Sequence, residues 1–329
     1  MKVEFKKIII KMPNFIGDSI MTLPAIELVR QEYPNASISI VCKRNIVDIF
    51  QDKNIAEIII DDTKENKKNR FKKTINLLFE IRKEKYDLGI LFHNTFIDAF
   101  IFKLSKISTI IGYDKEHRKI LLDFSLKIDR TRHYVNHYAN LINQFCDNKY
   151  TKLPKMNLNS QISTLLPKNN NQNIAFNLGG ENKDIRRYPK DLALKLFEFL
   201  KDEKFNILLL GDKEDKKNND IYEEYLKKQK SKVYNFSGKT SLREYINLIS
   251  SSDLLVTIDT SAMHISAAVG TKFLVLVGKG SSAFETVYPK VDFADFIFSG
   301  KDLIKDEDLI KAIKPIDIKN KILKIISGK

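Results

Sequence analysis

The sequence predicts an α/β fold built from two parallel sheets, each covered by helices on both faces. Two observations support this prediction. Short apolar runs alternate with amphipathic stretches along most of the chain, and strand–helix alternation is typical of parallel sheets. The alternation also stops once, at a polar segment, and then restarts. A chain of 329 residues is too long for one ordinary domain and suits two.

The first domain is predicted over residues 1–155. Its strands are predicted over Ile8–Ile10, Ser37–Val41, Glu57–Ile60, Leu88–Phe92 and Thr109–Ile111. Its helices are predicted over Asp18–Tyr33, Phe71–Arg82, Asn94–Leu104 and Tyr134–Phe145. The apolar residues of these four segments recur with a helical period, whereas the strand segments are short and rich in β-branched residues.

A linker is predicted over residues 156–173, because this segment contains Pro167 and the polar run Lys168–Asn173. The second domain then covers residues 174–329. Its strands are predicted over Ile174–Leu178, Ile207–Leu210, Val233–Phe236, Leu254–Ile258 and Phe273–Val277. Its helices are predicted over Pro189–Leu200, Glu214–Lys228, Leu242–Ile249 and Met263–Val269. The sequence does not decide whether the last helix packs on its own domain or back on the first domain. A cleft between two domains is a usual place for a ligand.

Composition narrows the class of protein. The net charge of +14 suggests an anionic partner, which could be nucleic acid, a phosphorylated substrate or an acidic membrane surface. The alternative is compositional drift, because the lysines are scattered and no nucleic-acid-binding motif is present. No apolar run approaches the roughly 18 residues of a spanning helix, and no signal-peptide pattern is seen. Cys42 and Cys146 lie far apart, as expected for reduced thiols of a cytoplasmic protein.

Asp18 lies where the first strand gives way to a helix, in the stretch Pro13–Pro24, PNFIGDSIMTLP. One interpretation is a helix N-cap, since a carboxylate there accepts hydrogen bonds from free N–H groups and meets the positive end of the helix dipole. The local sequence alone leaves open whether Asp18 also has a functional role.

Glycine turns follow the strands of the second half, at Gly179-Gly180, Gly211, Gly238-Lys239-Thr240 and Gly278-Lys279. Ligands of open parallel sheets bind beyond the carboxyl ends of strands, where glycine lets backbone N–H groups approach a phosphate. Neither G-x-x-x-x-G-K-[ST] nor a strand followed by G-x-G-x-x-G is present. This weakens the case for nucleotide hydrolases and dinucleotide dehydrogenases.

The stretch Leu254–Thr271 ends a strand in Asp259-Thr260-Ser261 and then begins a helix that carries His264. Side-chain oxygens and free N–H groups at one helix start make a good site for a diphosphate. The alternative is a helix cap followed by a core histidine.

The order of several motifs decides between these interpretations. The motifs are Ile16-Gly17-Asp18-Ser19 with Thr22-Leu23-Pro24-Ala25, His93-Asn94-Thr95 with Ala99-Phe100, Ile111-Gly112-Tyr113 with Arg118, Arg187-Tyr188-Pro189, Ser237–Leu242 and Asp259–His264. In this order the chain resembles the bacterial ADP-heptose:lipopolysaccharide heptosyltransferases of glycosyltransferase family nine, and it resembles the heptosyltransferase II branch most. The resemblance spans roughly residues 8–280.

The resemblance implies a GT-B architecture, in which two Rossmann-like doubly wound domains face a cleft. It implies an inverting transferase that moves heptose from ADP-heptose to a hydroxyl of the lipopolysaccharide or lipooligosaccharide inner core, with Asp18 as general base. Metal independence is expected from the sequence, because the Asp-x-Asp spacing Asp306-Glu307-Asp308 lies in a charged late segment that is typical of a solvated helix face. The implied donor-binding residues are Gly179, Gly180, Arg187, Lys239, Thr240, Asp259, Thr260, Ser261, His264 and Lys279. The implied acceptor-binding residues are Asn14, Gly17, Asn94, Arg118 and Arg132. No cofactor is expected.

The resemblance also implies a monomer at the inner face of the cytoplasmic membrane, where a basic surface would meet anionic head groups. Two departures keep alternatives open. Ser261 stands where the family usually has glycine, and Lys279 stands where it usually has proline. One alternative is therefore a related transferase with another nucleotide sugar or acceptor, for example for capsule or another surface glycan. The other is a non-catalytic protein that binds a nucleotide sugar.

Overall fold

The chain divides into two compact units, Met1–Asn157 and Leu158–Lys329. The computed structural model describes residues 4–64, 67–129, 131–179, 186–279, 283–299 and 308–328. The boundary between the units falls near the start of the segment 156–173, which the sequence analysis assigns to a linker. None of the described helices has the length and apolar character needed to span a bilayer.

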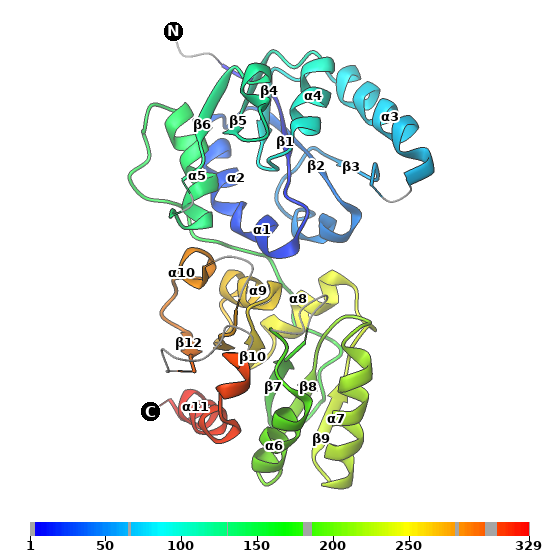
Figure 1. The fold of residues 1–329 in the computed structure, drawn as a ribbon, viewed down its shortest axis with the longest axis vertical. Coiled ribbons are helices and arrows are strands. Elements are labelled where there is room, and N and C mark those ends of the chain that lie inside the picture. The colour runs from blue at the N-terminus through cyan, green and yellow to red at the C-terminus, as the bar shows by residue number, and fades with distance from the viewer. Residues whose placement is uncertain are drawn as a thin grey trace. The chain divides into compact units, whose positions relative to one another are not determined.

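The first unit contains a parallel sheet whose six described strands follow the order β3-β2-β1-β4-β5-β6 (Figure 1). The strands are β1 (Lys7–Lys11), β2 (Ser37–Cys42), β3 (Glu57–Ile60), β4 (Leu88–Leu91), β5 (Thr109–Asp114) and β6 (Phe124–Lys127). Burial on both faces explains the apolar run Ile8–Ile10 in β1 and the uncharged sequence of β4.

The helices of the first unit are α1 (Ile16–Met21), α2 (Leu23–Glu32), α3 (Arg70–Lys83), α4 (Phe96–Leu104) and α5 (Tyr134–Phe145). The 3-10 helices are η1 (Arg44–Ile49), η2 (Lys67–Asn69) and η3 (Arg118–Leu121). Side chains of α3 and α4 share one apolar cluster with the sheet. The steps from β1 to β2 and from β4 to β5 run in opposite directions, so right-handed connections place α2 and α4 on opposite faces.

The second unit contains a parallel sheet whose described strands follow the order β12-β11-β10-β7-β8-β9. The strands are β7 (Gln172–Asn177), β8 (Phe205–Leu209), β9 (Lys232–Asn235), β10 (Leu254–Ile258), β11 (Phe273–Leu276) and β12 (Ala294–Ile297). The helices are α6 (Lys190–Leu200), α7 (Lys216–Lys228), α8 (Leu242–Ser250), α9 (Ser261–Val269), α10 (Phe284–Val287) and α11 (Pro315–Ser327), and η5 (Ile310–Ala312) is a 3-10 helix. Two doubly wound parallel sheets confirm the predicted α/β fold class.

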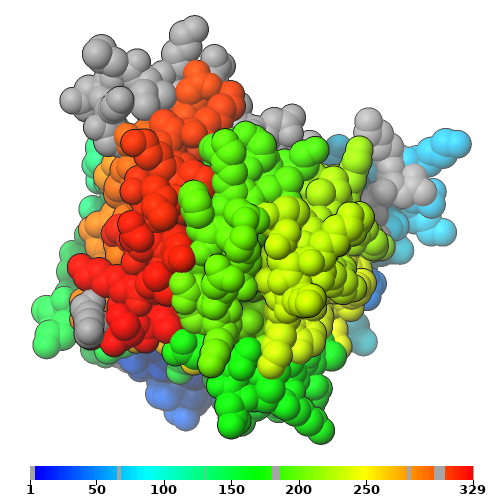
Figure 2. Space-filling model, turned by 90° about the horizontal axis from the view of Figure 1, so that it is seen from below, coloured from blue at the N-terminus to red at the C-terminus, as the bar shows by residue number. Residues whose placement is uncertain are grey.

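The last helix, α11, packs on α6 and β10 of its own unit. Figure 2 shows α11 in red beside the green helix α6, with the yellow-green helix α7 on the other side of α6. Ile318 and Ile322 of α11 are fully buried in the apolar core of the second unit. The start of the expected linker also belongs to this unit, because Leu158 N–H donates to Ala268 O at 3.0 Å and Ser163 N–H donates to Ser251 Oγ at 2.9 Å.

Candidate functional site

Asp18 lies beyond the carboxyl end of β1, in the first turn of α1. The helix begins at Ile16 and its N-cap is Phe15, so the interpretation of Asp18 as the N-cap is wrong. Ser19 explains this start, because both its N–H and its hydroxyl group donate to Phe15 O and so close the first turn there. The Asp18 side chain makes no hydrogen bond with any residue that the structure describes, which leaves its oxygens available to a substrate hydroxyl group.

Burial raises the pKa of Asp18 to about 6, and the nearby His93 opposes this shift. Tyr138 of α5 contributes to the buried surroundings, and its ring packs edge-on against Phe92 with 5.4 Å between centroids. An apolar environment disfavours the charged carboxylate and strengthens its affinity for a proton. A carboxylate with a pKa near 6 is still mostly ionised at neutral pH and is a better base than an ordinary aspartate.

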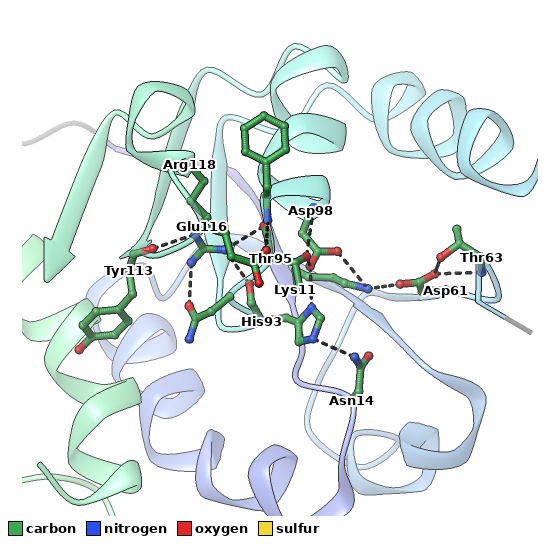
Figure 3. A network of polar contacts seen from close by, with 12 residues as sticks. Lys11, Asn14, Asp61, Thr63, His93, Thr95, Asp98, Tyr113, Glu116 and Arg118 are labelled. Atoms are coloured by element: carbon green, nitrogen blue, oxygen red, sulfur yellow. Dashed lines mark hydrogen bonds and ion pairs between the residues drawn. The ribbon is translucent and has the colours of Figure 1, made fainter. Parts of the chain in front are cut away.

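His93 joins the loop before α1 to the start of α4 (Figure 3). Its Nδ1 lies 2.6 Å from Asp98 Oδ2, and its Nε2 lies 2.8 Å from Asn14 Nδ2. Because an ionised carboxylate only accepts hydrogen bonds, Nδ1 carries the proton and Nε2 accepts from the Asn14 amide. These bonds fix the position of Asn14, four residues before Asp18.

Lys11 is an almost fully buried cation at the end of β1. Its ammonium group forms an ion pair with Asp61 and lies 3.8 Å from Asp98 Oδ1. Burial alone would raise the pKa of Asp61, but Lys11 and the hydroxyl group of Thr63 outweigh burial and hold that pKa at about 2. Burial would also raise the pKa of Asp98, but the hydrogen bond from His93 and then the charge of Lys11 outweigh burial and lower that pKa. Asp98 is therefore ionised and accepts the hydrogen bond from Nδ1–H of His93.

Arg118 is fully buried, and its guanidinium group is occupied by the protein itself. It donates to Tyr113 O at 2.7 Å, to His93 O at 2.8 Å and to Asn94 Oδ1 at 2.7 Å (Figure 3). The expectation that Arg118 binds the acceptor therefore has to be corrected. Burial and carbonyl acceptors give this side chain a structural role, in which it ties the end of β4 to the end of β5.

The other predicted acceptor residues of the first unit are more open. Asn14, Gly17 and Asn94 are half-buried at the carboxyl ends of β1 and β4. Arg132 lies on the loop between β6 and α5, where its exposed guanidinium group bonds Asn140 Oδ1 at 2.7 Å. The structure thus gathers Asn14, Gly17 and Asn94 with Asp18 at neighbouring strand ends, as parallel strands require.

Asp215 organises the strand ends of the second unit. A Cβ atom on Gly179 would lie 1.9 Å from Asp215 Oδ1, and one on Gly211 would lie 2.6 Å from Asp215 Cβ. Only glycine therefore fits beside this carboxylate at either turn. Asp212 N–H donates to Asp215 Oδ2 at 3.2 Å, and Arg187 Nη2 lies 3.6 Å from Asp215 Oδ1. These contacts bring Arg187 to the end of β7, next to Gly179.

Thr260 is the N-cap of α9, since its hydroxyl group accepts from Ala262 N–H at 3.3 Å. Asp259 and Ser261 are half-buried beside it at the end of β10, whereas the side chain of His264 is buried within α9. The helix start therefore offers backbone N–H groups and hydroxyl oxygens, and His264 packs behind it. Thr260 is thus a helix cap, as the simpler interpretation predicts, and the same helix start offers the N–H groups that the predicted anion site needs.

The remaining predicted donor residues also follow strand ends. Lys239 is exposed after β9 and donates to Asn235 O at 2.8 Å. Thr240 is half-buried next to it, and Lys279 is exposed after β11. Gly180 lies outside the described residues. In the part of the chain that the structure describes, no group of three or more His, Cys, Asp or Glu side chains is arranged to hold a metal ion.

Four polar side chains that shape these sites were not predicted from the sequence, namely Lys11, Asp98, Tyr138 and Asp215. Lys11 and Asp98 gave a local signal, because each is a charged residue within an apolar strand or helix. Tyr138 and Asp215 gave none. Their positions depend on long-range packing that a local pattern does not encode.

The family model for glycosyltransferase family 9 (heptosyltransferase) matches residues 75–290. The chain belongs to this family. The match to this family model includes the strand ends after β4 and β5 and those after β7, β8, β9, β10 and β11. Family membership confirms the resemblance found in the sequence.

Curated members of the family cover most of the chain. Lipooligosaccharide heptosyltransferase 2 of Campylobacter jejuni is 26% identical over 276 residues, which are 83% of this chain and 81% of the relative. The corresponding enzyme of Haemophilus influenzae is 25% identical over 298 residues and covers 84% of each chain.

Solved structures of family 9 show the same fold. The ADP-heptose lipopolysaccharide heptosyltransferase II of Escherichia coli superposes with a TM-score of 0.83 at 21% identity, covering 98% of this chain and 99% of the other. A family 9 glycosyltransferase of Veillonella parvula gives a TM-score of 0.86 at 18% identity, covering 100% and 99%. The architecture is therefore GT-B, as the sequence predicts.

Proposed function

We propose that this family 9 chain transfers heptose from ADP-heptose to a hydroxyl group of the inner core of lipopolysaccharide or lipooligosaccharide. Family membership supports a heptosyl transfer, and the names of the relatives support this donor and acceptor. The observation that carries the proposal is Asp18, a half-buried carboxylate whose pKa is about 6 and whose oxygens accept no hydrogen bond from the described residues.

The proposed reaction is a single displacement with inversion at the anomeric carbon. As the acceptor oxygen forms its bond to that carbon, the bond from the carbon to the diphosphate oxygen breaks, and ADP leaves with the electron pair. Asp18 takes the proton of the acceptor hydroxyl group in the same step. The network of Lys11, Asp98 and His93 holds Asn14, so the loop that leads to Asp18 keeps its geometry.

The departing diphosphate needs positive potential, which we assign to the second unit. The N–H groups at the start of α9, the hydroxyl group of Thr260 and the ammonium groups of Lys239 and Lys279 supply it. We propose that no metal ion is required. The enzyme acts as a monomer on the cytoplasmic side of the inner membrane and contacts its anionic head groups.

The test is a transfer assay with the purified chain, ADP-heptose and a core acceptor that lacks the added heptose. We expect product with ADP-heptose and little with UDP-glucose or GDP-mannose, and excess chelator should leave the rate unchanged. Turnover of another nucleotide sugar alone would favour the related transferase that Ser261 and Lys279 suggest. Binding of ADP-heptose without turnover of any acceptor would favour a binding protein, and loss of activity on chelation would contradict the metal-free reaction.

A further inference from the structure

The layer of the first unit formed by α3, α4 and η3 exposes an unusual amount of apolar surface. Fourteen large apolar side chains are exposed among the described residues, and seven of them lie in this layer. They are Phe71 and Phe79 on α3, Phe96, Ile97, Phe100 and Leu104 on α4, and Ile120 on η3. Single exposed apolar residues are normal on a protein surface, but a concentration of them marks an interaction surface.

These seven side chains point away from the same core. Leu77, Leu78 and Ile81 of α3 pack into one cluster with Ala99, Ile101 and Phe102 of α4 and with the sheet. The helices contact each other, and α4 also contacts η3, so the three elements form one layer on one face of the sheet (Figure 1). Side chains opposite the buried stripe therefore face outward together.

The exposed residues of α4 form a stripe along its outer face. Phe96, Phe100 and Leu104 are spaced four residues apart, which places them one turn after another along the helix. The rings of Phe96 and Phe100 stack with 6.1 Å between centroids. On α3, Phe71 is 81% exposed and Phe79 is 60% exposed, although both could have been polar at no cost to the core.

The same layer is strongly basic. Within its bounds, α3 carries five basic residues and one acidic residue, Glu80. Arg82 and Lys83 at the end of α3, Lys106 after α4 and Lys119 on η3 are exposed and form no ion pair within the described part of the chain. A surface with exposed aromatic residues among free basic side chains complements the interface of an anionic bilayer, where aromatic rings insert and each basic residue adds attraction.

We infer that the outer face of α3, α4 and η3 is the surface by which this protein binds an anionic phospholipid bilayer. The inference deepens the proposed function, since it rests on an acceptor that is held in a membrane. α4 begins at Phe96, three residues after His93, so a bilayer bound at α4 would bring a lipid-linked acceptor to the strand end that carries the His93 network.

The chain contains no tryptophan, which allows a direct test. A Phe100→Trp variant of the full chain has a single tryptophan on the proposed surface, and Phe199→Trp is its control, because Phe199 of α6 is 40% exposed and Phe100 is 39% exposed. With vesicles of phosphatidylcholine and phosphatidylglycerol, we expect a blue shift of emission for Phe100→Trp only. Vesicles of phosphatidylcholine alone should give little shift, and added salt should weaken binding.

Vesicle flotation then tests the residues. We expect Phe100→Ser with Leu104→Ser, and separately Arg82→Glu with Lys83→Glu, to lower binding at least about tenfold. The controls Phe199→Ser with Ile221→Ser, and Lys227→Glu with Lys228→Glu, should leave vesicle binding unchanged.

Equal loss of binding in variants and controls, or no binding by the unaltered chain, would overturn the inference. Concentration-dependent dimers that the α4 variant abolishes would overturn it too, by assigning this face to a second copy. No donor or acceptor is used, so this outcome is independent of the transfer assay.

Discussion

Asp18 combines two properties that oppose each other, since a buried carboxylate resists ionisation and a general base must be ionised. Burial raises its pKa to about 6, which still leaves the carboxylate mostly ionised at neutral pH. The local sequence identified Asp18 as a candidate but suggested that the helix start would favour its charge. The structure shows that burial outweighs the helix start, and burial depends on Tyr138 and on other residues far along the chain.

The first expected outcome is the pH dependence of transfer and of stability. The rate should fall as pH decreases through about 6, because Asp18 then takes up a proton.

The folded state binds this proton more tightly than the unfolded chain, so the stabilisation is full below pH 3.8 and is lost as pH rises through about 6. Asp18→Asn should therefore be more stable than the unaltered chain at pH 8, by on the order of 1 kcal/mol, with a smaller difference at pH 4. Thermal unfolding at both pH values measures this, and a destabilised variant at pH 8 would contradict it.

Arg118 gives the second expected outcome. Arg118→Ala would leave His93 O, Tyr113 O and Asn94 Oδ1 without their donor and would open a cavity, so we expect a loss of roughly 3–5 kcal/mol in the free energy of unfolding. Arg132→Ala is the control, with an expected loss below about 1 kcal/mol, because its ion pair is exposed. Urea unfolding compares the two. Similar losses would mean that Arg118 does not hold the strand ends together.

At the scale of elements, local patterns located most helices and strands, because strong apolar periodicity survives packing. The boundaries of β3, α5 and β10 agree with the sequence to the residue. The predicted helix Asp18–Tyr33 is instead two helices, α1 and α2, which separate at Thr22, two residues before Pro24. The edge strands β6 and β12 were missed, since both are short and only partly buried.

The segment that joins the units shows why composition misleads. Its asparagines and prolines are typical of a free linker, yet Asn169 and Asn206 exchange side-chain hydrogen bonds at 3.2 and 2.9 Å, and Leu158 is buried. We therefore expect a fragment of residues 158–329 to fold and bind ADP. A fragment of residues 174–329 should be less stable, because it lacks these contacts. Calorimetric titration with ADP and thermal unfolding of both fragments test this, and a folded fragment 158–329 that does not bind ADP would contradict it.

At the scale of the whole molecule, each unit presents polar side chains at the carboxyl ends of its parallel strands, and the two sets differ in chemistry. The first unit offers a carboxylate that can take up a proton, and the second offers a helix start and basic residues that suit a diphosphate. This division was visible in the sequence from the positions of strands and glycines. The supporting residues Lys11 and Asp215 were not, because their partners lie far away in sequence.

The most direct test of this account is the variant Asp18→Asn, measured for transfer, ADP binding and thermal unfolding together. Asn keeps the size of the side chain but cannot accept the proton of the acceptor, so transfer should fall by about a hundred-fold to ten-thousand-fold. ADP affinity should barely change, because we assign the nucleotide site to the second unit, and the melting temperature at pH 7 should not fall. Transfer near the normal rate, in a folded variant that binds ADP, would contradict the role of Asp18 as the general base.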